Sequence, residues 1–327
     1  MRNTALIQLV VKVALFALFF YLMYRFLLFN VSWREVSMYI GKADYLFLGA
    51  AIFFMFLRFI TLGFKFYLAT RALSTYQSLW SFLINELKLL FMEFVVPVPD
   101  AEDVFRALFL KMQGLGLSDI TKVIIAMRVS GMITLFLLLS GFWFFEVFEL
   151  PGISAKVGLV VVSFLLAGLF THRFWLKMLA GMISYKPLRL LLGQTVHDGP
   201  GFAQYISLVG MTLLYHMFSS VVIYCLASSM GVSLNPLILL LIIPLMSLSF
   251  IVPLSVQGLG LPEAVLLFAL LQLRVPAEIA SAISIIHLMI YIGFIVCGAV
   301  VFGLDKTYRL ETLWNQYYAF KAKYLST

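Results

Sequence analysis

The chain has 327 residues, of which 63% are apolar and only 12% are charged, and its formal net charge is +8. Soluble domains are about 45–50% apolar and about 25% charged, so this composition excludes a soluble globular protein. A cytoplasmic excess of Lys and Arg and contact with anionic lipid account for the positive charge, and a nucleic-acid partner is excluded.

The apolar residues fall into long runs that follow one another along the chain. A helix needs about 20 apolar residues to cross a bilayer. The runs are Leu6–Phe29, Tyr45–Thr70, Leu79–Val96, Ile120–Phe148, Ser154–Thr171, Phe202–Ser229, Pro236–Val252 and Ala277–Leu304. They predict an all-α polytopic membrane protein, in which the first run is retained as a helix because no cleavage site follows it.

Two of these runs end at a proline and are followed by a second, shorter helical segment. Leu79–Val96 stops at Pro97, and Pro236–Val252 stops at Pro253. Proline removes a backbone donor and breaks a helix. We therefore expect two helical hairpins broken at these prolines, in addition to about six full transmembrane helices.

Basic residues in the loops predict the orientation. Lys and Arg crowd the loop 173–201 and the tail 305–327, whereas the loop 230–235 carries no charge. Since cytoplasmic loops carry the excess of Lys and Arg, we expect both termini in the cytoplasm and the chain in the plasma membrane. With these loops on their expected sides, each hairpin must begin and end on the same side of the membrane, so we expect both hairpins to be re-entrant and to enter from opposite faces. The tail is expected to lie on the membrane surface as an interfacial helix.

The hairpins recur in the same order in two halves of the transmembrane domain 1–304, at about 45–148 and 202–304. An acidic residue opens the short helix after each break, Asp103 in the first half and Glu263 in the second. Arg128 and His287 then occupy corresponding positions in the next long run. Inverted repeats with broken helices at matching positions are typical of transporters that bind their substrate near the midplane.

The first hairpin supplies charged candidates for a lipid head-group site. Arg106 follows Asp103 by one helical turn, and a guanidinium can bind phosphate through two hydrogen bonds. Arg128 is a second candidate for the phosphate, and Asp103 could carry a proton. Glu86 and Glu93 could form a proton or head-group relay. The structural alternatives are a local Asp103–Arg106 ion pair and an internal Lys–Glu pair in the preceding helix.

The second hairpin supplies a polar, glycine-rich turn. Glycines allow close approach of the backbone to a ligand, and free amides at a helix start favour an anion. The candidate binding residues are Ser255, Gln257, Gly258, Gly260 and Glu263. His287 could take part in a relay or be only hydrogen-bonded, and the turn itself could be a plain loop at the membrane surface.

These two segments resemble the transmembrane region of lysylphosphatidylglycerol synthases, also called the flippase-like membrane domain family. Pro97, Asp103 and Arg106 resemble its first motif, although Asp100, Ala101 and Glu102 stand where glycines are usual. The family's second motif is matched by five residues of the second hairpin, Pro253, Ser255, Gly258, Gly260 and Glu263. The resemblance implies lipid handling, without the soluble synthase domain that some members carry.

Together these features predict a flippase-like transporter that moves an anionic or modified-head-group lipid between leaflets. Its expected partners are a phospholipid or polyprenyl-type lipid and the bilayer, with homo-oligomerisation left open, and no metal or other cofactor is expected. A membrane-embedded enzyme that modifies a lipid and a scaffold that only binds partner helices are the alternatives. Analysis of the lipid product separates an enzyme from a transporter, because only the enzyme changes the mass of the lipid. Substitution of Asp103 and Glu263 separates a scaffold from both, because only a scaffold should tolerate it.

Overall fold

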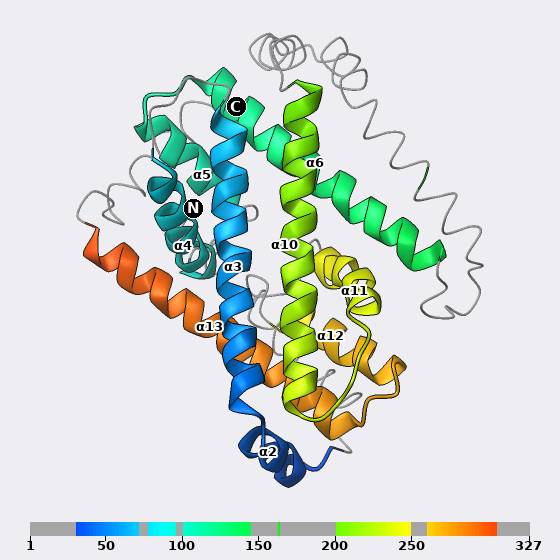
Figure 1. Cartoon of the computed structure of the whole chain (residues 1–327). Coiled ribbons are helices and arrows are strands. Elements are labelled where there is room, and N and C mark those ends of the chain that lie inside the picture. The colour runs from blue at the N-terminus through cyan, green and yellow to red at the C-terminus, as the bar shows by residue number, and fades with distance from the viewer. Residues whose placement is uncertain are drawn as a thin grey trace, which may run out of the picture. The chain divides into compact units, whose positions relative to one another are not determined.

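The computed structural model describes residues 31–71, 78–95, 101–144, 163, 201–249 and 260–305. The regular elements in these ranges are all helices, as predicted (Figure 1). They are α2 (Trp33–Gly41), α3 (Tyr45–Thr70), α4 (Leu79–Val95), α5 (Ala101–Met112), α6 (Leu117–Phe144), α10 (Phe202–Ser229), α11 (Pro236–Ser249), α12 (Leu261–Gln272) and α13 (Ala277–Leu304).

Four of these helices, α3, α6, α10 and α13, are long and apolar enough to cross a membrane. They contain 26 to 28 residues each, which is about 40 Å of helix and more than a bilayer core requires. The chain is therefore a multi-pass membrane protein. The predicted span Leu6–Phe29, nearly all of the predicted span Ser154–Thr171 and the tail beyond Asp305 lie outside the described residues.

The two runs that stop at a proline each form a pair of shorter helices. Helix α4 packs against α5, and α11 packs against α12, so the chain turns back between the members of each pair (Figure 1). Helices α4 and α11 have 17 and 14 residues. Pro97 and Pro253, the predicted breaks, lie between the members of each pair and outside the described residues.

Contacts between Cα atoms divide the chain into two compact units. Unit 1 comprises Met1–Arg58, Leu135–Phe164 and Leu214–Ile292, and unit 2 comprises Phe59–Thr134, Leu165–Leu213 and Gly293–Thr327. The boundary falls inside α3, α6, α10 and α13, so each long helix contributes one stretch to each unit. Unit 1 contains the α11–α12 pair, and unit 2 contains the α4–α5 pair.

Unit 2 has an aromatic core beside the α4–α5 pair. Phe66 and Phe82 meet edge to face with ring centroids 5.0 Å apart, and Phe109 of α5 packs on both rings. On α13, a Cβ at Gly298 would collide with the carbonyl oxygen of Leu87. Glycine therefore lets the backbones of α13 and α4 approach closely at this point.

Unit 1 holds the α11–α12 pair against the other halves of the long helices. The amide of Asp44 donates to the carbonyl of Ser229 at 2.9 Å, which joins the start of α3 to the end of α10. Gly260, immediately before α12, has φ of 90°, a conformation that L side chains rarely adopt. Its amide donates to Oε2 of Glu263 at 2.8 Å, so this carboxylate caps the start of α12.

Candidate functional site

The centre of the charged site in unit 2 is a buried pair between α5 and α4. Nε of Arg106 donates to Oε1 of Glu86 at 2.9 Å, and Nη2 donates to Oε2 at 2.8 Å. The two side chains are 5% and 3% exposed. This is the bidentate geometry in which a guanidinium binds a carboxylate most strongly, and it joins the two helices of the hairpin through their charges.

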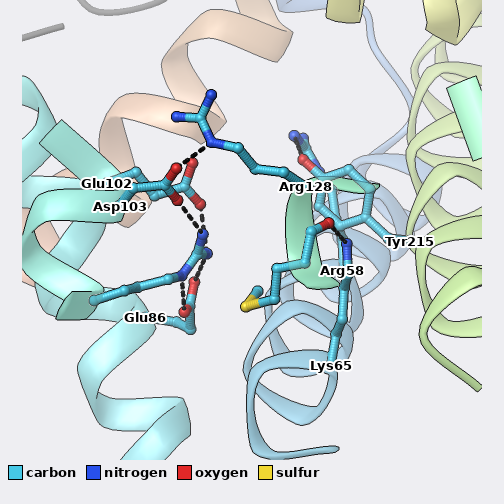
Figure 2. Close-up of polar contacts among 9 residues, drawn as sticks. Arg58, Lys65, Glu86, Glu102, Asp103, Arg128 and Tyr215 are labelled. Atoms are coloured by element: carbon cyan, nitrogen blue, oxygen red, sulfur yellow. Dashed lines mark hydrogen bonds and ion pairs between the residues drawn. The ribbon is translucent and has the colours of Figure 1, made fainter. Parts of the chain in front are cut away.

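Two further carboxylates extend this pair toward the surface. Arg106 also forms ion pairs with Glu102, one turn earlier on α5, and with Asp103, whose Oδ1 lies 3.9 Å from Nη1. Figure 2 shows Arg128, from α6, reaching the same Asp103 through its Nε. Glu102 and Arg128 are 40% and 49% exposed, so they form the rim of the cluster. The i,i+3 pair predicted for Asp103 and Arg106 is present, but it is the longest of these contacts.

Lys65 and Glu93 complete the charged cluster. Lys65 of α3 is buried, and its Nζ donates to the carbonyl of Met127 at 3.1 Å (Figure 2). Lys65 and Glu93 each interact electrostatically with the Arg106 network. If all groups are ionised, the carboxylates of Glu86, Glu93, Glu102 and Asp103 outnumber the cations Lys65, Arg106 and Arg128 by one.

The Lys–Glu pair considered within α4 is not the arrangement that the structure contains. Glu86 is paired with Arg106 on α5, and Lys88 is paired with Asp305, at the end of α13. Each of these two charged residues therefore connects α4 to another helix of unit 2. Since ion pairs between helices depend on how the chain folds back, residue spacing along α4 could not reveal them.

In unit 1, Glu263 and His287 lie next to each other. Nδ1 of His287 is 3.6 Å from Oε1 of Glu263, and the two side chains are 9% and 10% exposed. Gly260 contacts Glu263 as described above. Ser255, Gln257 and Gly258, the other predicted binding residues of this hairpin, lie outside the described residues.

Sequence reasoning missed Glu102 and Tyr215 as contributors to these sites, and it did not identify the partners of Arg58 and Lys65. Glu102 lies four residues before Arg106, a helical spacing that allows an ion pair, so this contact could have been predicted from the sequence. Arg58 and Tyr215 in unit 1 form a hydrogen bond across 157 residues, and no local pattern could connect them. Lys65 follows Arg58 by seven residues in an apolar run, so the sequence allows a side chain that faces a cavity or one that reaches out to the membrane surface. In the structure Lys65 is buried.

The fold and these sites define a multi-pass helical membrane protein that keeps buried, paired charges between its helices. Residues 9–298 match the model of the family described as the lysylphosphatidylglycerol synthase TM region, and the chain belongs to this family. The resemblance noted from the two hairpin motifs is thereby confirmed. A comparison with curated proteins finds no match.

Proposed function

We propose that the chain moves a lipid with a modified or anionic head group between the two leaflets of the bilayer. The lipid is a phospholipid or a polyprenyl-type lipid, and its acyl or prenyl chains stay in the membrane. The observation that carries this proposal is the charged cluster around Arg106 in unit 2. Charged groups among apolar helices are costly and usually serve a purpose, and this cluster extends from a buried pair to an exposed rim.

The arrangement of the cluster suggests a division of roles. The guanidinium of Arg106 already has a bidentate carboxylate partner, so its main role is to hold Glu86 and the α5 carboxylates in place. Arg128, at the exposed rim, is better placed to meet a lipid phosphate, and Glu102 and Asp103 to meet an amine or hydroxyl.

We also propose the inverted repeat with six full spans and two re-entrant hairpins. In support, the α4–α5 pair precedes α6 and the α11–α12 pair precedes α13. Both of these long helices begin with an acidic residue in the first turn, Asp119 in α6 and Glu278 in α13. The same proposal includes two roles for ionisable groups. Asp103 and Glu263 carry protons, and a proton or head-group relay runs through Glu86, Glu93 or His287.

The proposal is tested by reconstituting the full chain in liposomes that contain fluorescent derivatives of phosphatidylglycerol, lysyl-phosphatidylglycerol or a polyprenyl phosphate. Leaflet-selective quenching measures translocation, and mass spectrometry of the extracted lipid measures chemical change. Translocation above that of empty liposomes, with unchanged lipid mass, is the expected result. A changed mass would indicate a lipid-modifying enzyme, and the absence of both effects would indicate a scaffold.

A further inference from the structure

Helix α2 lies at the face of unit 1 where α3 begins and α10 ends. It ends at Gly41 and α3 begins at Tyr45, and a chain segment of this length spans at most about 14 Å. The amide of Asp44 donates to the carbonyl of Ser229, the last residue of α10, so both membrane-spanning helices reach this face at one level. Helix α2 runs at an angle to α3 there (Figure 1). It is therefore within reach of the membrane surface.

Buried apolar residues and a helix cap hold α2 in place. Val36 in the middle of the helix is buried, and so are Val31 before it and Ala43 after it. The amide of Glu35 donates to Oγ of Ser32 at 3.4 Å, which satisfies one of the free amides at the start of the helix. Helix α2 is therefore a packed part of unit 1, and only its other side chains are exposed.

The exposed side chains of this region are both aromatic and charged. Trp33 is 47% exposed and Tyr45 is 82% exposed. Arg34, Glu35 and Lys42 are exposed in the same segment. Trp and Tyr are enriched where head groups meet acyl chains, because one end of each side chain is apolar and the other is polar. Charged groups are costly among acyl chains. The mixture therefore fits the head-group layer of a bilayer.

The exposed side chains change in character along α3. Beyond its first turn they are apolar, namely Ile52, Phe53 and Phe56. These side chains suit the acyl region, whereas the aromatic and charged ones at α2 and at the start of α3 suit the head groups. The change places the boundary of the membrane near Tyr45, at the level where α10 ends.

We propose that α2 is an interfacial helix whose exposed side contacts the head-group layer of the bilayer. The rings of Trp33 and Tyr45 lie where the head groups meet the acyl chains, and the charged side chains lie among the head groups. The partner is this layer of the membrane, and the contact fixes the depth of unit 1 in the bilayer. It does not require that the chain move lipid, so it can hold even if the proposed function fails.

Spin labels on single cysteines measure the depth of each position in phosphatidylglycerol-containing nanodiscs. The variants are Trp33→Cys, Tyr45→Cys and Phe53→Cys, in a full chain whose native cysteines are replaced. Collisions with oxygen, which concentrates among acyl chains, and with a water-soluble nickel complex report the depth. Phe53→Cys is the matched control: Phe53 is 55% exposed, and it follows Tyr45 by about 12 Å of helix.

We expect the labels of Trp33→Cys and Tyr45→Cys to lie in the head-group layer, about 10 Å shallower than the label of Phe53→Cys. A Trp33→Cys label that meets the nickel complex as freely as a label in water would show that α2 stands away from the membrane. A label as deep as that of Phe53→Cys would place α2 among the acyl chains. A label that neither reagent reaches would indicate a protein partner. Each of these three results would overturn the assignment.

A second measurement keeps the native Trp33 side chain in place and so does not depend on the cysteine variants. The chain has five tryptophans, and the difference in fluorescence between the wild type and Trp33→Phe reports Trp33. Lipids brominated near the glycerol or near the ends of the acyl chains quench at different depths. We expect the shallow bromines to quench the Trp33 signal more strongly. Equal or stronger quenching by the deep bromines, or no quenching by either, would contradict the interfacial position.

Discussion

At the scale of single residues, the charged site depends on contacts between helices. Sequence spacing correctly predicts that Asp103 and Arg106 share a face of α5, and the ion pair between them exists. It could not predict that Glu86, on the other helix of the hairpin, takes both hydrogen bonds of the Arg106 fork. Local periodicity shows which residues share a helix face, but the partner across a hairpin depends on how the two helices pack.

We expect Glu86→Gln to destabilise the protein by about 1.5–3 kcal/mol, because the buried guanidinium of Arg106 loses its bidentate carboxylate and keeps only the ion pairs with Glu102 and Asp103. The measurement is thermal or denaturant unfolding of the purified protein in detergent. Asp119→Asn is the control: it breaks the ion pair with Lys122, in which Asp119 is 41% exposed, and should cost less than about 1 kcal/mol. Equal stability of Glu86→Gln and Asp119→Asn would contradict the buried pair.

At the scale of helices, apolar run length predicted most of the architecture. The runs Tyr45–Thr70, Phe202–Ser229 and Ala277–Leu304 coincide with α3, α10 and α13, and α6 begins three residues before its predicted run, at Leu117. The two helix pairs were predicted from the prolines that follow the runs Leu79–Val96 and Pro236–Val252, because proline removes a backbone donor. A proline does not by itself decide where a helix ends, since Pro244 lies inside α11. Helix α2, with 9 residues, was missed: it has no long apolar run, and its local signal is the cap by Ser32.

We expect Gly298→Ala to destabilise unit 2 by about 1–3 kcal/mol, because the added methyl group would collide with the backbone carbonyl of Leu87 and force α13 away from α4. Unfolding of the purified variant measures this. Gly293→Ala, in the same helix, is the matched control, since no atom lies within 4 Å of its new Cβ. It should be neutral or stabilise by up to about 1 kcal/mol through helix propensity. A Gly298→Ala variant as stable as the control would show that the two backbones are not in close contact.

At the scale of the whole molecule, composition alone predicted a helical multi-pass membrane protein, because only lipid can accommodate so much apolar surface. The two hairpin motifs predicted the family, which is confirmed over residues 9–298. Composition could not predict which polar groups meet. The Arg58–Tyr215 and Lys88–Asp305 contacts join residues 157 and 217 positions apart, and such pairs depend on the tertiary packing of the long helices.

We expect both termini and the loop 173–201 on the cytoplasmic side, because Lys and Arg concentrate there. Single-cysteine variants Ser326→Cys and Ser233→Cys, in a chain whose native cysteines are replaced, test the orientation with a membrane-impermeant thiol reagent on intact cells. Ser233 is exposed in the uncharged loop between α10 and α11, so its variant should react. The Ser326→Cys variant should react only after permeabilisation, and the reverse pattern would invert the topology.

The central claim is that the Arg106 cluster serves lipid translocation and is more than an ion pair that holds a hairpin together. The most direct test is leaflet-resolved translocation by the Asp103→Asn, Arg106→Gln double variant, which exchanges charges for neutral groups of similar size. Unfolding of the purified variant in detergent first confirms that it is folded and as stable as the wild type. We expect this folded variant to translocate lipid about 10-fold more slowly than the wild type, because the cluster loses its central cation and the carboxylate bound by Arg128. Translocation at the wild-type rate would show that the cluster is only structural and would contradict the account.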